Sequence, residues 1–494
     1  MKPTTAREAL PGSAAPILVW FRQDLRLDDN PAFAAAAATG RPIIPVYILD
    51  DRMPGQWRLG GASRWWLHHS LSALGETLAK HALALVLRAG EAAAVLPALA
   101  EETGAGGVYW NRCYEPYAVR RDAALKSALL AAGVEARSFN AALLAEPWEA
   151  STVSGGPFRV YTPFQKALRA RLGNDPPKPS HAPASAVAPE RWPASDRLAD
   201  WKLLPDKPDW AGGLRATWQP GSSAASSRLA EFLDGPLPDY AADRDRCDLA
   251  ATSALSAHLH WGEIGPRRIW QAAHERMAQD GATERGADKF LSELVWREFA
   301  HHLLFHYPDL PEANWRARFD GFPWRSDPAG LAAWQRGLTG YPMVDAGMRQ
   351  LWETGWMHNR ARMIAASFLA KHLLIHWRQG EAWFWDTLVD ADLANNAAGW
   401  QWVAGSGADA APYFRIFNPV IQGRKHDPEG AYARRFVPEL AKLPTRWIHA
   451  PWEAPKAVLA ESGVALGRTY PHPIVDHAMA RERALAAYKS MPQD

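Results

Sequence analysis

The sequence predicts an α/β plus all-α protein, in which an N-terminal doubly wound parallel sheet is joined by a long connector to an all-helical C-terminal domain. Three observations predict this fold class. Apolar runs alternate with helical patterns up to about residue 140, prolines then accumulate, and helical periodicity continues beyond residue 222. A chain of 494 residues also exceeds the usual size of one core. We therefore expect domains over 1–140 and 222–494, with an irregular connector over 141–221.

The N-terminal part shows short apolar runs of the kind that form strands buried on both faces. Strands are expected at 16–21, 43–48, 84–88, 107–110 and 135–139. Helices are expected between them, at 31–38, 62–80, 92–103 and 118–132. This alternation is typical of a parallel sheet covered on both faces. No Gly-x-Gly-x-x-Gly turn follows a strand, so the usual dinucleotide-binding turn is absent.

The connector is rich in proline, and within it a short helix is expected to start at Tyr161. The pattern beyond it is helical. Helices are expected at 224–233, 255–259, 265–278, 288–307, 328–336, 344–355, 358–377 and 380–388.

Composition narrows the class of protein. A hydrophobic content of 48% with 22% charged residues is typical of a globular protein in water, and the net charge of +2 leaves any nucleic-acid site to a local cluster. Two cysteines, Cys113 and Cys247, lack metal-ligand spacing, so we expect a reducing cytoplasm and no metal site. No signal peptide or membrane span is expected. The 25 tryptophans are unusual, and some are expected to stack ligands or carry electrons rather than pack.

The stretch from Asp390 to Pro419 carries the densest polar and aromatic chemistry. Two carboxylates, three amides and two tryptophans fall within its first thirteen residues. We interpret it as the wall of a site for a large planar cofactor, although a capped helix end explains any one of these residues. Its candidate residues are Asp390, Asp392, Asn396, Trp400 and Trp402.

A second group of candidates lies at 251–259. Three hydroxyls, those of Thr252, Ser253 and Ser256, stand at an expected helix start, where backbone N–H groups can hold a phosphate. Tyr240 upstream could add a phenolic donor. A plain Ser/Thr helix cap is the competing interpretation.

A third group lies on the helix expected at 288–307. Glu293 and Trp296 are three residues apart and share a face, with Arg297 beside them. A carboxylate next to an indole suits a planar heterocycle whose edge is hydrogen-bonded while its face is stacked. A surface Glu beside a buried Trp is the alternative.

The helix expected at 358–377 opens on a fourth group. Asn359 and Met363 share a face, with Arg360 on its shoulder as a candidate phosphate ligand. Arg362 is placed to pair with a carboxylate such as Asp390, which would compensate a buried charge.

A basic run extends from Arg415 to Arg446, with seven Lys or Arg against three acidic residues. Such a cluster can supply the sequence-independent part of DNA binding, or it can be an ordinary solvated face.

Taken together, these motifs resemble the photolyase and cryptochrome family over nearly the whole chain, from Trp20 to about Asp476. The stretches 20–30, 252–256 and 390–419 resemble its N-terminal, FAD-phosphate and flavin-wall motifs. Residues 400–410 and 470–477 look most like bacterial class III cyclobutane pyrimidine dimer photolyases. The resemblance implies a deoxyribodipyrimidine photo-lyase, which is a carbon–carbon lyase that uses FAD to repair UV-damaged duplex DNA. It favours methenyltetrahydrofolate as an antenna chromophore and implies no obligate protein partner.

The resemblance also implies residue roles. The FAD pyrophosphate region would be held by Tyr240, Thr252, Ser253, Leu255 and Ser256. Asn396 would face flavin N5, and Asp390, Asp392 and Arg362 would hold the isoalloxazine side. The dimer would contact Glu293, Trp296, Trp402, Asn359 and Met363, and DNA phosphates would contact Arg360 and Arg415, with Arg297 flanking. Trp400, Trp377 and Trp324 would carry electrons from the surface.

Single positions favour one subtype within the family. The (6-4) photolyases carry His at the positions of Asn359 and Met363, and neither Asn nor Met can supply a proton. The resemblance therefore favours cyclobutane dimers as substrate. Two alternatives stay open, namely a cryptochrome-type photoreceptor that signals through a protein partner and a flavoprotein without photochemistry.

Overall fold

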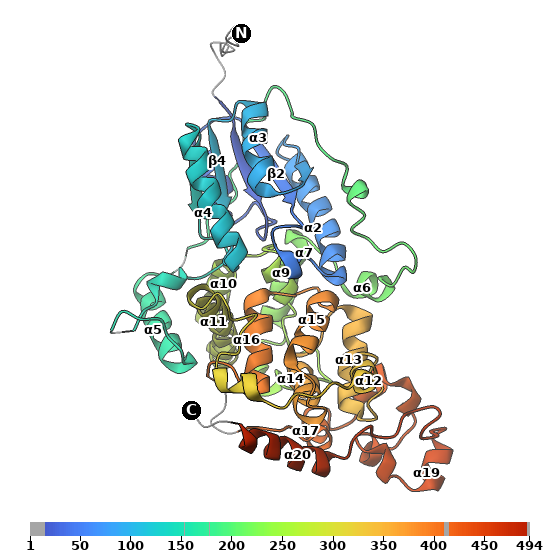
Figure 1. Cartoon of the computed structure of the whole chain (residues 1–494). Helices are drawn as coiled ribbons and strands as arrows, with labels where there is room; N and C mark the ends of the chain where they lie inside the picture. The colour runs from blue at the N-terminus through green and yellow to red at the C-terminus, as the bar shows by residue number, and fades with distance from the viewer. Residues whose placement is uncertain (1–14, 153, 177, 410–413, 492–494) are drawn as a thin grey trace, which may run out of the picture.

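The computed structural model describes residues 15–152, 154–176, 178–409 and 414–491. A sheet domain lies at the top of Figure 1 and a helical domain below it. The connector places α5 at the left of the view, and its later part runs down the right side to α6. The predicted fold class is confirmed. Within the described part of the chain, no helix is both long and apolar enough to pass through a lipid bilayer.

The sheet has five parallel strands in the order β3-β2-β1-β4-β5. Their bounds are β1 Ile17–Phe21, β2 Ile43–Leu49, β3 Val86–Ala89, β4 Gly107–Asn111 and β5 Glu135–Phe139. Four helices join them, α1 Pro31–Ala37, α2 Gly61–Ala79, α3 Ala92–Thr103 and α4 Pro116–Ala131. Side chains alternate along each strand, so Ile17, Val19 and Phe21 pack with α1 and α2, whereas Leu18 and Trp20 pack with α3 and α4. Both faces are covered, as the apolar runs predict.

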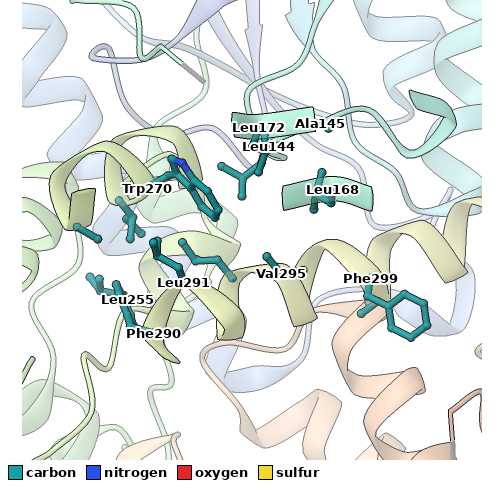
Figure 2. Packing of buried hydrophobic residues seen from close by; sticks show 14 of the residues in the cluster. Leu144, Ala145, Leu168, Leu172, Leu255, Trp270, Phe290, Leu291, Val295 and Phe299 are labelled. Atoms are coloured by element: carbon teal, nitrogen blue, oxygen red, sulfur yellow. The ribbon is translucent and has the colours of Figure 1, made fainter. Parts of the chain in front are cut away.

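The connector holds α5 Tyr161–Asn174 and α6 Gly212–Thr217. Figure 2 shows how residues from the connector, such as Leu144 and Leu168, pack against Leu291, Val295 and neighbouring side chains of the long helix α11 Glu284–His306. Glu298 on the same helix accepts hydrogen bonds from the Leu144 and Ala145 backbone. Burial raises the pKa of this carboxyl to about 7. Strand β5 ends at Phe139 and α7 starts at Ser222. We therefore propose that the sheet domain ends near residue 140 and that the helical domain begins near residue 222.

The helical domain begins with α7 Ser222–Asp234. Its remaining helices are α8 Tyr240–Asp243, α9 Ser256–His260, α10 Pro266–Gln279, α11, α12 Pro328–Gln335, α13 Pro342–Thr354, α14 Asn359–Ser367, α15 Trp377–Thr387, α16 Leu393–Ala404, α17 Pro419–His426, α18 Ala431–Phe436, α19 Lys456–Glu461 and α20 His477–Ser490. Most helices match the predicted ones within a few residues.

The helix predicted over 358–377 is wrong as one element. Helix α14 ends at Ser367, a π-helical turn follows over Phe368–His372, and α15 starts at Trp377. The break is set by His376, whose Nδ1 accepts a hydrogen bond from the Arg378 N–H at 3.2 Å and caps α15. Burial, helped by Arg378, lowers the pKa of His376 to about 4, which keeps this nitrogen free to accept. Histidine is not among the usual capping residues, so the signal was missed.

One close contact between the two domains lies at Gly262, between α9 and α10. The Arg26 guanidinium donates to the Gly262 carbonyl at 2.8 Å, and the Leu25 N–H donates to the Trp261 carbonyl at 3.1 Å. Gly262 has φ of +63°, and a Cβ there would lie 2.1 Å from the Gln23 carbonyl oxygen. Only glycine permits this approach.

Replacing Gly262 with alanine is therefore expected to destabilise the protein by about 2 kcal/mol or more, from left-handed strain and the backbone clash. Gly281→Ala is the matched control, because nothing lies within 4 Å of its added Cβ, and it should change stability by less than about 0.5 kcal/mol. Thermal unfolding of both variants measures the difference. Equal melting temperatures would show that the domain contact tolerates a side chain.

Candidate active site in the helical domain

A cavity of about 470 Å³ lies between α11, α14, α15 and α16, with Arg244 after α8 at its edge. This volume falls in the range of ligand sites. Of the predicted site residues, eleven line it: Glu293, Trp296, Asn359, Arg360, Arg362, Met363, Asp390, Asp392, Asn396, Trp400 and Trp402. Residues separated by more than a hundred positions therefore line one cavity. A larger cavity, of about 780 Å³, lies between α5 and α10 and contains none of them.

The predicted ion pair between Arg362 and Asp390 is present. The Arg362 Nη2 lies 2.8 Å from Asp390 Oδ2 and 3.1 Å from Oδ1, while its Nε donates to the Met357 carbonyl. The Asp390 side chain is only 3% exposed. The pair places an oriented acceptor, the Asp390 carboxylate, and an oriented donor, the Arg362 guanidinium, at the cavity wall.

Asp392 caps the start of α16 by accepting from the Asn395 N–H at 2.8 Å. Two buried histidines approach its Oδ2, His301 at 3.4 Å and His260 at 3.6 Å. Burial by itself would raise the pKa of Asp392, but these two imidazoles outweigh it and hold the pKa well below its ordinary value. The cavity wall therefore contains a second charged carboxylate, supported from behind by histidines that sequence analysis did not single out.

Asn396 lies one turn into α16. Its amide donates to the Glu381 carbonyl of α15 at 3.1 Å, which fixes the plane of the side chain at the cavity. Trp400, farther along α16, has a buried indole N–H that has no partner within the described residues. Fixed amides, carboxylates and an indole face suit a planar heterocycle with a polar edge, so these residues fit a flavin ring.

The opposite wall comes from α11 and α14. Glu293 pairs with Arg244 through Oε1 at 2.5 Å and Oε2 at 3.2 Å, and with Lys289 at 2.9 Å. Arg244 lines the cavity and was missed, although it follows the predicted Tyr240 by four residues. Asn359 Nδ2 lies 4.0 Å from Met363 Sδ, which agrees with the predicted shared face.

The indole of Trp296 stacks on Tyr161 of the connector helix, with ring centroids 3.5 Å apart and planes within 3°. One face of Trp296 is therefore covered by protein, and the other remains for a ligand. Arg360, at the start of α14, pairs with Asp245 at 2.5 Å. The cavity edge thus combines arginines with carboxylates that hold them in place.

Several predicted residues do not line the cavity. Arg297 donates to the Ala142 carbonyl at 2.7 Å and is largely buried, so it braces the connector, and its predicted contact with DNA stays a prediction. Tyr240 is buried edge-on between Phe232 and Phe290. The other predicted residues outside the cavity are Thr252, Ser253, Leu255, Ser256, Trp324, Trp377 and Arg415.

The segment that carries the hydroxyls of Thr252, Ser253 and Ser256 leads into a short helix. Helix α9 starts at Ser256 and spans five residues, with Leu255 as its cap. Thr252 and Ser253 therefore precede the helix, and Ala254 has a positive φ of 49°. The helix starts one residue beyond the predicted position, and a phosphate role for this segment stays a prediction.

The basic run is partly used by the fold. Arg434 donates to the backbone carbonyls of Glu429 and Leu443, Arg424 pairs with Glu453, and Arg446 covers the ring of Trp447. These cations stabilise loops at the C-terminal end, so the net charge counted from sequence overstates what is available to a partner. Residues 410–413, inside the predicted flavin-wall motif, lie outside the described residues.

The three tryptophans predicted to carry electrons lie on adjoining elements. Trp377 is fully buried at the first position of α15. Its ring lies 5.7 Å from His376, which in turn lies 4.9 Å from Trp324. Gly380, three residues beyond Trp377, allows Trp400 to rest against α15, because a Cβ at Gly380 would lie 2.1 Å from the indole. The series therefore follows one face of α15 toward the cavity.

A sheet domain on a helical domain that encloses an acidic, amide-rich and aromatic cavity defines a two-domain cofactor-binding protein. Comparison with known proteins specifies the cofactor. Residues 290–490 match the model of the FAD binding domain of DNA photolyase, and residues 17–184 match that of DNA photolyase. The chain is 55% identical over 477 residues to a deoxyribodipyrimidine photo-lyase of Agrobacterium fabrum, which covers 97% of this chain and 98% of the relative.

Cryptochrome-2 of Arabidopsis thaliana is 42% identical and covers 94% of this chain and 77% of its own length. Among solved structures, a bacterial class III photolyase from Agrobacterium tumefaciens has a TM-score of 0.93 at 54% identity, with 99% of both chains covered. The chain therefore belongs to the photolyase and cryptochrome family. The predicted enzyme class, a deoxyribodipyrimidine photo-lyase, and the predicted FAD are the ones that these comparisons support.

The buried ion pair gives a direct test of the cavity wall. Replacing Arg362 with Met leaves Asp390 buried without its partner and is expected to cost about 3–5 kcal/mol of stability. Arg215→Met is the matched control, since the Arg215 and Asp209 side chains are 49% and 44% exposed and exposed pairs contribute little to stability. Chemical denaturation measures both. Equal losses would mean that the Arg362 pair does not organise the cavity.

Proposed function

We propose that the chain repairs cyclobutane pyrimidine dimers in duplex DNA with light. The observation that carries the proposal is the single cavity lined both by Glu293, Trp296 and Trp402 and by Asp390, Asp392 and Asn396. The first set suits a flipped-out base pair, and the second set suits a flavin. Bound FAD, when reduced and excited by light, supplies the electron that opens the cyclobutane ring.

The protein's own contribution is position and charge. A dimer inside a duplex is inaccessible, so it is turned out into the cavity, and a poorly stacked pair is the cheapest to turn out. Trp402 and the free face of Trp296 stack the bases, while Glu293, oriented by Arg244, accepts hydrogen bonds from their edges. Arg360 and Arg415 contact flanking phosphates.

The cofactor side has separate residues. Arg362 with Asp390, together with Asp392, holds polar groups on the flavin side, and Asn396 presents an amide to it. Tyr240 and the 252–256 loop hold the phosphates. Asn359 and Met363 complete the dimer side, and since neither can transfer a proton, cyclobutane dimers fit this cavity better than (6-4) products.

An antenna is the second component of the proposal. We propose a methenyltetrahydrofolate, which is what the resemblance to class III photolyases implies. We expect the absorption spectrum of the purified protein to show a band beyond those of flavin, and we expect this band to be lost when folate is withheld.

Because Cys113 and Cys247 are unpaired, we also propose that the protein works in the cytoplasm.

Repair itself is tested with the full-length protein carrying reduced flavin. Under blue or near-UV light it should restore thymine dimers in duplex DNA to thymines, and it should leave (6-4) products unchanged. Absence of light-dependent repair would favour the alternative, a cryptochrome-type photoreceptor. The sequence identity to Arabidopsis cryptochromes is the reason for this alternative.

Glu293 should matter for the damaged base and not for the DNA backbone. Glu293→Ala is expected to weaken binding of dimer-containing duplex about tenfold or more, the effect of one lost hydrogen bond to a charged group. Binding of undamaged duplex should be no weaker, because a negative charge is removed. Glu275→Ala, on α10 outside this cavity, is the control. Equal weakening of binding to both duplexes would show that Glu293 does not contact the dimer.

The tryptophan series predicts a selective defect. Trp377→Phe should slow light-driven reduction of the bound flavin at least tenfold, while repair by protein supplied with chemically reduced flavin stays normal. Trp334→Phe is the comparison, because Trp334 lies 6.1 Å from Trp400 on another side. If photoreduction were lost in Trp334→Phe and kept in Trp377→Phe, electrons would reach the flavin through Trp334 and not through Trp377.

A further inference from the structure

Lys371 occupies an unusual place in the helical domain. It is 3% exposed, and it lies in the π-helical turn Phe368–His372 between α14 and α15. Within the described residues no carboxylate lies within ion-pairing distance of its ammonium group. Burial, with a smaller effect from Arg415, lowers the pKa of Lys371 to about 7. Burying an ammonium without an acid opposes folding, so this residue does not stabilise the fold through its charge.

The Lys371 amine is directed at one segment of the chain. Its Nζ donates to the Arg415 carbonyl at 2.5 Å and lies 4.3 Å from the centroid of the Phe414 ring. Phe414 is fixed further by Tyr488 of α20, with ring centroids 4.7 Å apart and planes within 15°. Lys371 therefore contacts the backbone of Arg415 and the side chain before it.

The segment has a second anchor beyond Arg415. The Phe417 N–H donates to Ser367 Oγ at 3.4 Å, and Asn418 caps α17 with its side chain. Residues 414–418 thus run between fixed points in the lower part of the helical domain, beside α17 and α20 in Figure 1. Of these residues Arg415 has an exposed side chain, whereas its carbonyl faces Lys371.

The π-helical turn explains how Lys371 reaches this carbonyl. Each residue rotates an α-helix by about 100°, so a turn that is one residue wider redirects the side chains that follow it. Turns of this kind are rare and often mark functional positions. The π-helical turn and the buried ammonium group are both unfavourable by themselves, and the hydrogen bond that they make possible is the one to the Arg415 carbonyl.

We propose that Lys371 is a positioning residue for Arg415, which holds the Arg415 backbone so that the exposed guanidinium is directed at a DNA phosphate. The inference rests on the proposed function, because it takes Arg415 as a phosphate contact. It adds the residue that orients that contact from inside the protein. Lys371 itself touches neither DNA nor cofactor.

A double-mutant cycle tests the assignment. The full-length flavin-loaded protein, Lys371→Met, Arg415→Ala and the double variant are titrated with duplex DNA containing one thymine dimer, over a series of NaCl concentrations. Each single variant should bind about tenfold more weakly, and the slope of log affinity against log salt should fall by about one, the signature of one lost phosphate contact. The double variant should bind within about twofold of Arg415→Ala. Lys489→Met, exposed on α20, should leave affinity and slope unchanged.

Three results would overturn the assignment. The first is additive losses in the double variant, and the second is an unchanged salt slope in Lys371→Met. The third is a Lys371→Met protein that loses flavin absorbance or melts below wild type, because Lys371 would then support the fold and not Arg415. The expected variant melts at or above the wild-type temperature, since the buried charge is gone. Failure of the proposed function is separate and shows as wild-type protein that binds damaged and undamaged duplex equally and repairs neither.

Discussion

The ion pair between Arg362 and Asp390 is the interaction on which the site depends. It joins α14 to the loop before α16, and both elements line the cavity. A buried carboxylate is stable there only while the guanidinium stays in place, so the two elements keep one separation. Asp392, two residues on, is supported by His260 and His301 in the same way. Charge compensation therefore shapes the cavity before any ligand enters it.

The break between α14 and α15 is the second constraint. A continuous helix over 358–377 would place Trp377 at its end and would leave no π-helical turn. The capped start at His376 makes Trp377 the first residue of α15, where Gly380 brings Trp400 close. The same break places Lys371 under the Arg415 carbonyl. One irregular joint thus positions residues on both the electron-carrying side and the DNA side of the proposed site.

Much of the fold could be predicted because apolar spacing reports burial directly. The five strands and their helices follow from runs that only a doubly covered sheet can bury. The helix break could not be predicted in this way, since histidine is not among the usual capping residues and only the folded chain brings its Nδ1 to the Arg378 N–H. Arg297 shows the same limit. Its spacing on α11 matches Glu293 and Trp296, yet the connector backbone at Ala142 takes its guanidinium.

Sequence patterns were enough to predict the two-domain architecture, the family and eleven of the residues that line the cavity, because motif residues lie close together within 293–296, 359–363 and 390–402. Tertiary structure alone decided which of their partners matter. Tyr161 covers one face of Trp296, Arg244 orients Glu293, and two histidines hold Asp392. These contacts join residues far apart in the chain, and no local pattern encodes them. Periodicity reports which face of an element is buried, whereas packing decides what that face meets.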